Sequence, residues 1–269
     1  MNGASPLLFS AMKEDILPSL PQFSCDSLLP ARAFRRALKV FSAIVRYNHL
    51  GARSEHRHGG QIPRSELQEL LQLWALEVIS TLNLQVQRCS GYKPLPTPTL
   101  FVGNHLSYLD IPVLMSQVPV VLLGKAEILH WPILGAAGRR AGMVFVKRDS
   151  DGSRRQAARA ISDCLGSRGM SLGLFPSGTT SLDEGRPWRT GAFKIAMEGG
   201  FPVQPFRLRY KPMLTAAFVG QDALVPHLFR LLKAGPIRVT IEFGEPVLVT
   251  NPENTAKELW TWSRANLRG

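Results

Sequence analysis

Residues 101–110 read FVGNHLSYLD, and they connect a strand-like apolar run to a helix-like one. The run Thr99–Val102 predicts a buried strand, and a helix is expected to begin at Ser107. His105 therefore follows the end of a strand, and Asp110 lies in the first turn of the helix. Two side chains five residues apart point to different faces of a helix. The pair can meet only if His105 precedes the helix.

A histidine with a carboxylate beside it is what a base that activates a hydroxyl requires. The neutral imidazole accepts a proton near neutral pH, and the carboxylate fixes its tautomer and stabilises the imidazolium. The alternative is structural, because Ser107 and Asp110 have the spacing of a capping box and a carboxylate is favoured at a helix N-terminus. The sequence predicts His105 and Asp110 as a catalytic pair, with capping as the alternative.

The charge of the chain narrows the classes of partner. Its 269 residues suit one α/β domain with an appendage. Lysine and arginine number 32 against 20 acidic residues, a formal net charge of +12. Such a charge suits nucleic acid, anionic lipid or an acidic carrier protein. Nucleic-acid binding would rest on charge alone, without a zinc-finger or RRM-like signature in the sequence, so we expect no nucleic-acid partner.

Cysteine spacing and hydropathy indicate the cellular compartment of the protein and how it associates with a membrane. The three cysteines form no CxxC pair, so we expect a reducing compartment, no disulfide framework and no metal site. Charged residues at 13–15 interrupt the apolar run that a signal peptide needs. The sequence contains no window of about 18 uninterrupted apolar residues, so no transmembrane helix is expected. The expected location is peripheral, on the cytoplasmic face of a membrane.

Residues 1–98 are expected to form an irregular lead-in, over 1–30, and two helices. The first helix, over 31–50, has an apolar face and a basic face. The apolar face holds Phe34, Leu38, Phe41 and Val45, and the basic face holds Arg32, Arg36, Lys39 and Arg46. Such a helix is typical of a lipid interface, with its apolar side toward acyl chains and its arginines toward phosphates. The alternative is a helix docked on its own domain with a solvated basic face.

A polar linker is expected over 51–63. Ser65 and Gln68 then have the spacing of a capping box, and an apolar helical stripe continues to about Gln87. The two helices together predict an N-terminal helical hairpin that associates with membranes.

Residues 99–269 alternate between strand-like and helix-like runs. The strand-like runs are 99–102, 118–123, 143–147, 171–175, 203–210, 214–219 and 237–243, and the helix-like runs are 107–117, 133–141, 153–166, 190–198, 223–232 and 253–267. The last helix has Asn251 as its N-cap and Pro252 at its first position. The alternation predicts an α/β fold: a mainly parallel central sheet, covered by helices on both faces, with sites at the carboxyl ends of strands.

Three more segments carry polar groups at strand ends or prolines in an apolar run: 142–148, 175–181 and 201–205. Individually, a terminal cation is usually solvated and a Ser-Gly-Thr segment is usually a turn. A phosphate-binding loop of the Walker type is excluded because the Gly-Lys-Ser/Thr sequence is missing. The G-x-S-x-G match at 169–173 places its serine at the start of the strand-like run 171–175, and not in the strand-to-helix turn that a serine-hydrolase elbow requires.

Taken in order, these blocks resemble the glycerolipid acyltransferase family of the lysophosphatidate acyltransferase type. The first motif of that family, His-x4-Asp, matches His105–Asp110, preceded by Asn104. The second matches 142–148, with Lys125 to Glu127 upstream in the style of the family. The third, usually Phe-Pro-Glu-Gly-Thr, matches 175–181, and the fourth matches 201–205.

Two residues depart from the family pattern. The usual glutamate is Ser177, and a position that often holds a phosphate-binding arginine is Thr180. Hydroxyls do not replace the charge of a bidentate arginine. Members that resemble lyso-ornithine-lipid acyltransferases carry threonine at the position of Thr180. Nearby cations either compensate for this loss or are solvated surface charges: Arg148, Arg186, Arg189 and Lys194.

The resemblance implies acyl transfer from an acyl thioester, on acyl carrier protein or coenzyme A, to a lysolipid hydroxyl. His105 would take the proton of the hydroxyl while Asp110 orients the imidazole, and the turn at Gly178 would hold the oxyanion or the acceptor headgroup. No cofactor and no metal are implied. The substrate-binding residues that the resemblance implies are Asn104, Ser107, Lys125, Arg148, Ser177, Gly178, Thr179, Thr180 and Arg189.

The acceptor expected first is 1-acylglycerol-3-phosphate, in phospholipid biosynthesis, at an anionic membrane surface. A phosphate-free lysolipid, such as lyso-ornithine lipid, is the alternative. A lipid-surface binding protein with a decayed site is an alternative of another class, which the retention of both His105 and Asp110 disfavours.

Overall fold

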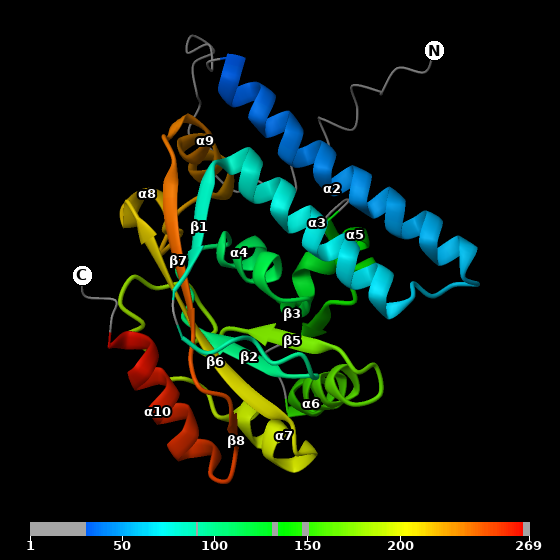
Figure 1. Cartoon of the computed structure of the whole chain (residues 1–269), viewed down its shortest axis with the longest axis vertical. Coiled ribbons are helices and arrows are strands. Elements are labelled where there is room, and N and C mark those ends of the chain that lie inside the picture. The colour runs from blue at the N-terminus through cyan, green and yellow to red at the C-terminus, as the bar shows by residue number, and fades with distance from the viewer. Residues whose placement is uncertain (1–30, 90, 131–133, 147–150, 266–269) are drawn as a thin grey trace.

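The computed structural model describes residues 31–89, 91–130, 134–146 and 151–265, so the expected lead-in over 1–30 lies outside the described residues. One sheet runs through the molecule in the order β1-β7-β6-β2-β5-β3-β4, and β8 pairs with β6 (Figure 1). The strands are β1 (Leu84–Arg88), β2 (Leu100–Gly103), β3 (Val120–Lys125), β4 (Val144–Val146), β5 (Ser171–Leu174), β6 (Pro202–Lys211), β7 (Ile237–Phe243) and β8 (Val247–Leu248).

Most of the sheet is parallel. The pairs β6–β2, β2–β5, β5–β3 and β3–β4 are parallel, whereas β7 and β8 are antiparallel to β6. Every residue of β2 and β5 is buried, as is usual for central strands with both faces covered. The predicted α/β fold with a mainly parallel sheet is confirmed.

Helices cover both faces of the sheet. They are α2 (Ala31–Arg57), α3 (Arg64–Leu82), α4 (Asp110–Gln117), the 3₁₀ helix η1 (Ala126–His130), α5 (Leu134–Arg140), α6 (Asp151–Leu165), α7 (Gly191–Gly199), α8 (Met213–Ala216), α9 (Leu224–Lys233) and α10 (Pro252–Arg264). Helices α2, α3 and α4 gather on one side, and α6, α7 and α10 on the other (Figure 1). The predicted hairpin is α2 and α3, which an ion pair between Arg57 and Glu66, 2.7 Å long, ties near its turn.

The centre of the sheet is filled by aromatic rings. Phe101, Phe206 and Phe243 are buried, and the Phe243 ring centroid lies 6.0 Å from that of Phe101 and 6.4 Å from that of Phe206. Each such ring contributes about 1.5–3 kcal/mol by burial. A Cβ at Gly103 would lie 2.4 Å from the Phe206 ring. Glycine therefore lets the end of β2 pass this ring, which brings His105 to the edge of the sheet.

The hairpin differs from the sequence prediction at three places. The expected linker over 51–63 is helical as far as Arg57, and the turn that follows contains Gly59 and Gly60 at positive φ. The capping box at Ser65 and Gln68 is wrong: α3 begins at Arg64, and its N-cap Pro63 makes no side-chain cap bond. The helix expected to reach Gln87 ends at Leu82.

The end of α3 has a clear cause. Asn83 adopts the left-handed conformation, with φ of 58°, and its N–H bonds to the last turn of the helix. Asparagine tolerates this conformation, which commonly ends a helix. The residues that follow become β1 and pair in parallel with β7. The division of the chain at residue 98 stays a prediction, and β1 from its N-terminal side belongs to the same sheet as the rest.

The strand expected over 214–219 is also wrong. Its first residues belong to the short helix α8, and Ala216 and Ala217 are buried. The backbone of this segment is hydrogen-bonded elsewhere: the Ala217 N–H donates to the carbonyl of Met213 at 2.8 Å, and the Phe218 N–H donates to the carbonyl of Leu106 at 2.9 Å. In contrast, the predicted cap of α10 is confirmed, because the Asn251 side chain accepts the N–H of Asn254 at 2.9 Å.

Candidate active site

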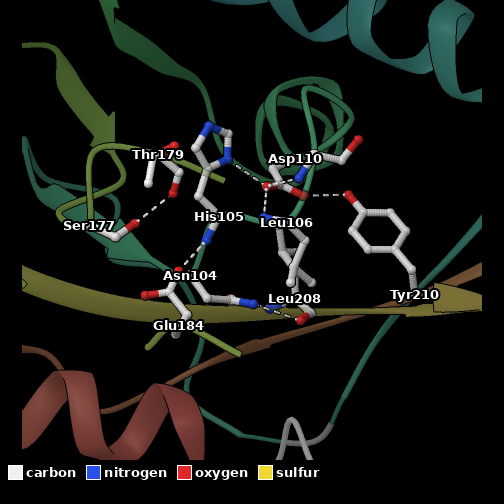
Figure 2. A network of polar contacts seen from close by, with 10 residues as sticks. Asn104, His105, Leu106, Asp110, Ser177, Thr179, Glu184, Leu208 and Tyr210 are labelled. Carbon is white, nitrogen blue, oxygen red and sulfur yellow. Dashed lines mark hydrogen bonds and ion pairs between the residues drawn. The ribbon is translucent and has the colours of Figure 1, made fainter. Parts of the chain in front are cut away.

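His105 and Asp110 meet at the carboxyl edge of the sheet. His105 lies in the loop after β2, and Asp110 is the first residue of α4. The Nδ1 atom of His105 lies 2.7 Å from Oδ2 of Asp110 (Figure 2). The Asp110 side chain is wholly buried, whereas that of His105 is 19% exposed. The histidine precedes the helix, which is the one arrangement that the five-residue separation allows.

Asp110 accepts four hydrogen bonds. Besides His105, its Oδ2 accepts the backbone N–H groups of Leu106 at 2.7 Å and Ser107 at 3.0 Å. Its Oδ1 accepts the hydroxyl of Tyr210 at 2.7 Å. A buried carboxylate needs such partners to remain charged. Asp110 therefore caps the loop and holds the histidine at the same time, so that the two interpretations of this residue coexist.

Only half of the alternative capping box at Ser107 and Asp110 forms: Asp110 accepts the Ser107 N–H, but the Ser107 hydroxyl makes no return bond among the described residues. The N-cap of α4 is Leu109, and no side-chain cap bond is made there. The Ser107 hydroxyl is buried and has no hydrogen-bond partner among the described residues. The carboxylate of Asp110 occupies the loop N–H groups instead, because the chain turns back on itself before the helix begins.

The segment after β5 contacts the ring and the backbone of His105. The imidazole stacks on Phe175, with ring centroids 4.0 Å apart and an interplanar angle of 9°. The backbone N–H of His105 donates to Oε1 of Glu184 at 2.6 Å, and its carbonyl accepts the N–H of Ser181 at 2.8 Å. Because β2 and β5 are parallel neighbours, their carboxyl ends meet here. Among the described residues, Nε2 of His105 has no hydrogen-bond partner, whereas Nδ1 is engaged by Asp110.

Glu184 is a site residue that the sequence does not reveal. Its side chain is wholly buried, its Oε2 accepts Nε1–H of Trp188 at 2.9 Å, and its carbonyl accepts Nε1–H of Trp260 at 2.9 Å. Burial is the main cause that raises the pKa of this carboxyl, and its hydrogen bonds to His105 and Trp188 oppose the rise. In the sequence it follows Asp183 in a polar loop, which is typical of a solvated acid.

Asn104 ties the same loop to β6. Its Nδ2 donates to the carbonyl of Leu208 at 3.0 Å, and its Oδ1 accepts the N–H of Leu208 at 2.7 Å (Figure 2). The side chain is wholly buried. The structure places this predicted substrate-binding residue in a backbone contact that fixes the position of its neighbour, His105.

Comparison with known proteins identifies the family. Residues 86–209 match the family described as Acyltransferase. The lyso-ornithine lipid O-acyltransferase of Pseudomonas aeruginosa is 36% identical over 185 residues, which cover 67% of this chain and 70% of that protein. This chain belongs to the acyltransferase family.

One further relative and one solved structure are similar to this acyltransferase. The 1-acyl-sn-glycerol-3-phosphate acyltransferase of Neisseria meningitidis is 31% identical over 152 residues, 56% of this chain and 59% of that protein. The crystal structure of the 1-acyl-sn-glycerophosphate (LPA) acyltransferase PlsC from Thermotoga maritima matches with a TM-score of 0.64 and 19% identity, over 89% of this chain and 96% of that one. The structural similarity shows that the two chains share a fold.

The turn after β5 of the acyltransferase is built from small polar residues. The Ser177 hydroxyl is buried and donates to the carbonyl of Thr179 at 3.1 Å. Gly178 has φ of +75°, which favours glycine, and its N–H donates to the carbonyl of Phe175 at 3.0 Å. That N–H, an expected oxyanion donor, is therefore already used within the turn. Thr179 is exposed and Thr180 half-buried, so the turn presents hydroxyls outward.

The predicted cations are distributed unevenly around this turn. The N–H of Arg189 donates to the carbonyl of Pro176 at 3.2 Å, so exposed Arg189 lies beside the turn. Lys194 lies 3.1 Å from Glu253 of α10 and is engaged there. Arg148 and the side chain of Lys125 lie outside the described residues. In the described part of the chain, no group of three or more His, Cys, Asp and Glu side chains is arranged to hold a metal ion.

The first helix of the hairpin, α2, combines the two predicted alternatives. Its apolar side chains are half exposed: Phe34 53%, Leu38 51%, Phe41 49% and Val45 42%. Two arginines of the predicted basic face contact the protein itself. Arg36 donates to the carbonyls of Thr81 and Leu232, at 2.7 and 2.8 Å, and Arg46 pairs with Glu77. Across the described ranges, the acyltransferase has no helix that is both long and apolar enough to span a membrane.

Proposed function

We propose that this acyltransferase moves an acyl group from a thioester to the hydroxyl of a lysolipid, with His105 as the general base. The observation that carries the proposal is the 2.7 Å contact between His105 Nδ1 and Asp110 Oδ2. A histidine that donates from Nδ1 to a carboxylate has its lone pair at Nε2, ready to accept a proton. The His105 side chain is 19% exposed.

The chemistry then follows in two steps. Nε2 takes the proton of the acceptor hydroxyl as its oxygen attacks the thioester carbonyl, and Asp110 stabilises the imidazolium that forms. The tetrahedral intermediate collapses, the thiol leaves with the proton from Nε2, and the ester is formed. The acyl group passes directly from donor to acceptor, so no acyl-enzyme is required. General base catalysis of this kind contributes about 10²–10⁴-fold.

The donor in this proposal is acyl carrier protein or coenzyme A charged with a fatty acid. Both are acidic, and the formal net charge of +12 favours their approach. The acceptor stands at a membrane surface, and we place the protein there as a peripheral enzyme on the cytoplasmic face. The exposed apolar stripe of α2, defined by Phe34, Leu38, Phe41 and Val45, supports this location, because half-exposed large side chains in one row favour an apolar partner.

The first candidate acceptor is 1-acylglycerol-3-phosphate, on which the Neisseria relative acts by its name. The exposed Arg189 beside the turn supports recognition of a phosphate. Lyso-ornithine lipid is the second candidate. It is favoured by the hydroxyls of Ser177 and Thr180, which carry no charge for a phosphate, and by the greater identity to the Pseudomonas relative.

The test is an assay of thioester consumption and ester formation with labelled acyl carrier protein and acyl coenzyme A. The two candidate acceptors and other lysophospholipids are compared side by side in mixed micelles, with His105→Ala as the inactive control. We expect transfer to one acceptor class that requires His105. Absence of transfer to every lysolipid, with vesicle binding intact, would instead support the lipid-surface binding protein.

A further inference from the structure

The hydroxyl of Tyr210 reaches the carboxylate that orients the proposed base. Tyr210 lies in β6, and its side chain is buried, with 5% exposed. Its hydroxyl donates to Oδ1 of Asp110 at 2.7 Å, on the opposite side of the carboxylate from His105 (Figure 2). The other three bonds to Asp110 go to Oδ2. Among the described residues, Tyr210 is the one hydrogen-bond partner of Oδ1.

The neighbourhood of this pair contains few other ionisable groups. Glu184, from the segment after β5, faces the backbone of His105. Tyr108, in the loop before α4, donates its hydroxyl to Nδ1 of His227 in α9, at 2.8 Å, because Nε2–H of His227 donates to the carbonyl of Ala217. The Tyr108 hydroxyl is therefore engaged by His227, and the phenol that donates a hydrogen bond to the Asp110 carboxylate is that of Tyr210.

We propose that Tyr210 is a positioning residue for acyl transfer, which fixes the plane of the Asp110 carboxylate and takes up part of its charge. The inference rests on the proposed role of His105 and Asp110. A carboxylate bonded through both oxygens cannot rotate without breaking bonds. A carboxylate that shares charge with a phenol also attracts the His105 proton less strongly, which limits how far imidazolium is favoured over imidazole.

The chemistry of the phenol suits this role. Burial, and the charge of Asp110 beside it, raise the pKa of Tyr210 well above its ordinary value, so the hydroxyl stays protonated and remains a donor. The same loop is tied to β6 by the two bonds between Asn104 and Leu208. Loss of the hydroxyl alone should therefore leave the fold in place while it changes the carboxylate.

The test compares Tyr210→Phe with Tyr108→Phe, a matched control that also removes one phenolic hydroxyl from the same region. In Tyr210→Phe we expect kcat to fall roughly tenfold, the size of one hydrogen bond, with the acceptor KM within about twofold. The acid limb of the kcat/KM profile should move to higher pH, because Asp110 regains the charge that it shared. Tyr108→Phe should leave the profile in place.

Two further measurements separate this inference from the proposed function. The titration midpoint of the His105 imidazole, followed by NMR without substrate, should move to higher pH in Tyr210→Phe and stay in place in Tyr108→Phe. This readout does not depend on the identity of the acceptor, and it stands even where no lysolipid is turned over. In an Asp110→Asn background, Tyr210→Phe should have no further effect on kcat. An unmoved titration, or equal effects of the two Phe variants, would make Tyr210 a structural tie and overturn the inference.

Discussion

Glu184 offers a perturbation whose size follows from its contacts. Its carboxylate accepts two N–H groups, from His105 at 2.6 Å and from Trp188 at 2.9 Å. Each hydrogen bond to a charged group contributes about 1.5–3 kcal/mol. In Glu184→Gln the amide has one acceptor oxygen, so one donor is left against an NH₂ group, and we expect a loss of about 1.5–3 kcal/mol in the free energy of unfolding. Glu184→Ala loses both bonds and leaves a cavity, so its loss should be roughly twice as large.

Urea unfolding of both variants measures these losses. Asp183→Asn is the matched control, because this neighbouring carboxylate is exposed and accepts bonds from Ser181 and Gly185, which lie in its own loop. A surface change of this kind should stay within about 0.5 kcal/mol. A Gln variant as stable as wild type would refute the reasoning. Glu184→Ala should also lower kcat, since His105 would lose one of its two backbone anchors.

The dependence of the free energy of unfolding on pH tests the role of Glu184 separately. Burial raises the pKa of Glu184 above its ordinary value of 4.5, so the folded protein holds this proton more tightly than the unfolded chain does. The wild-type free energy of unfolding therefore gains from this group below pH 4.5, and the gain declines as pH rises toward the raised value. Glu184→Gln lacks this term. The stability gap between wild type and variant should narrow as pH increases, and a gap that widens would contradict the assignment.

The other predictions concern the base, the lipid surface and the last helix. His105→Ala should lower kcat about 10²–10⁴-fold in the thioester assay with an unchanged circular dichroism spectrum, and near-normal turnover would rule out the mechanism. Replacing Phe34 and Phe41 by Gln should reduce the free energy of vesicle binding, measured by sedimentation, by about 1–2 kcal/mol per ring, largely independent of salt. The Lys39→Gln control should have a small, salt-dependent effect. Equal effects would argue against an apolar contact. Asn251→Ala should cost about 1 kcal/mol in urea unfolding, and no loss would show that the cap is dispensable.

Local patterns predicted some elements of the fold to the residue. The strand Ile237–Phe243 has the predicted bounds, because its residues alternate between buried and more exposed. The cap at Asn251 is equally local. The strand Leu84–Arg88 was beyond such patterns: its apolar residues continue the helical stripe of α3, and the left-handed turn at Asn83 is what ends the helix.

The candidate site shows the same division. The meeting of His105 and Asp110 follows from their separation along the chain, because only one local arrangement brings them together. The contacts of Tyr210 and Glu184 depend on how distant segments lie against that loop. Gly103 pairs with Phe206, and this register of β2 and β6 places Tyr210 beside α4. A sequence pattern carries no information about such a register, so both residues looked like ordinary strand and loop positions.

The segment after β5 links recognition and rate in one stretch of chain. It presents the hydroxyls that are proposed to meet the acceptor, and it also holds the ring, the N–H and the carbonyl of His105 through Phe175, Glu184 and Ser181. A substitution that reshapes the turn for a new headgroup therefore also moves the base. Adaptation of this enzyme to another lysolipid should proceed through paired changes, one in the turn and a second that restores the position of the histidine. Selectivity and speed are not independent traits in this chain.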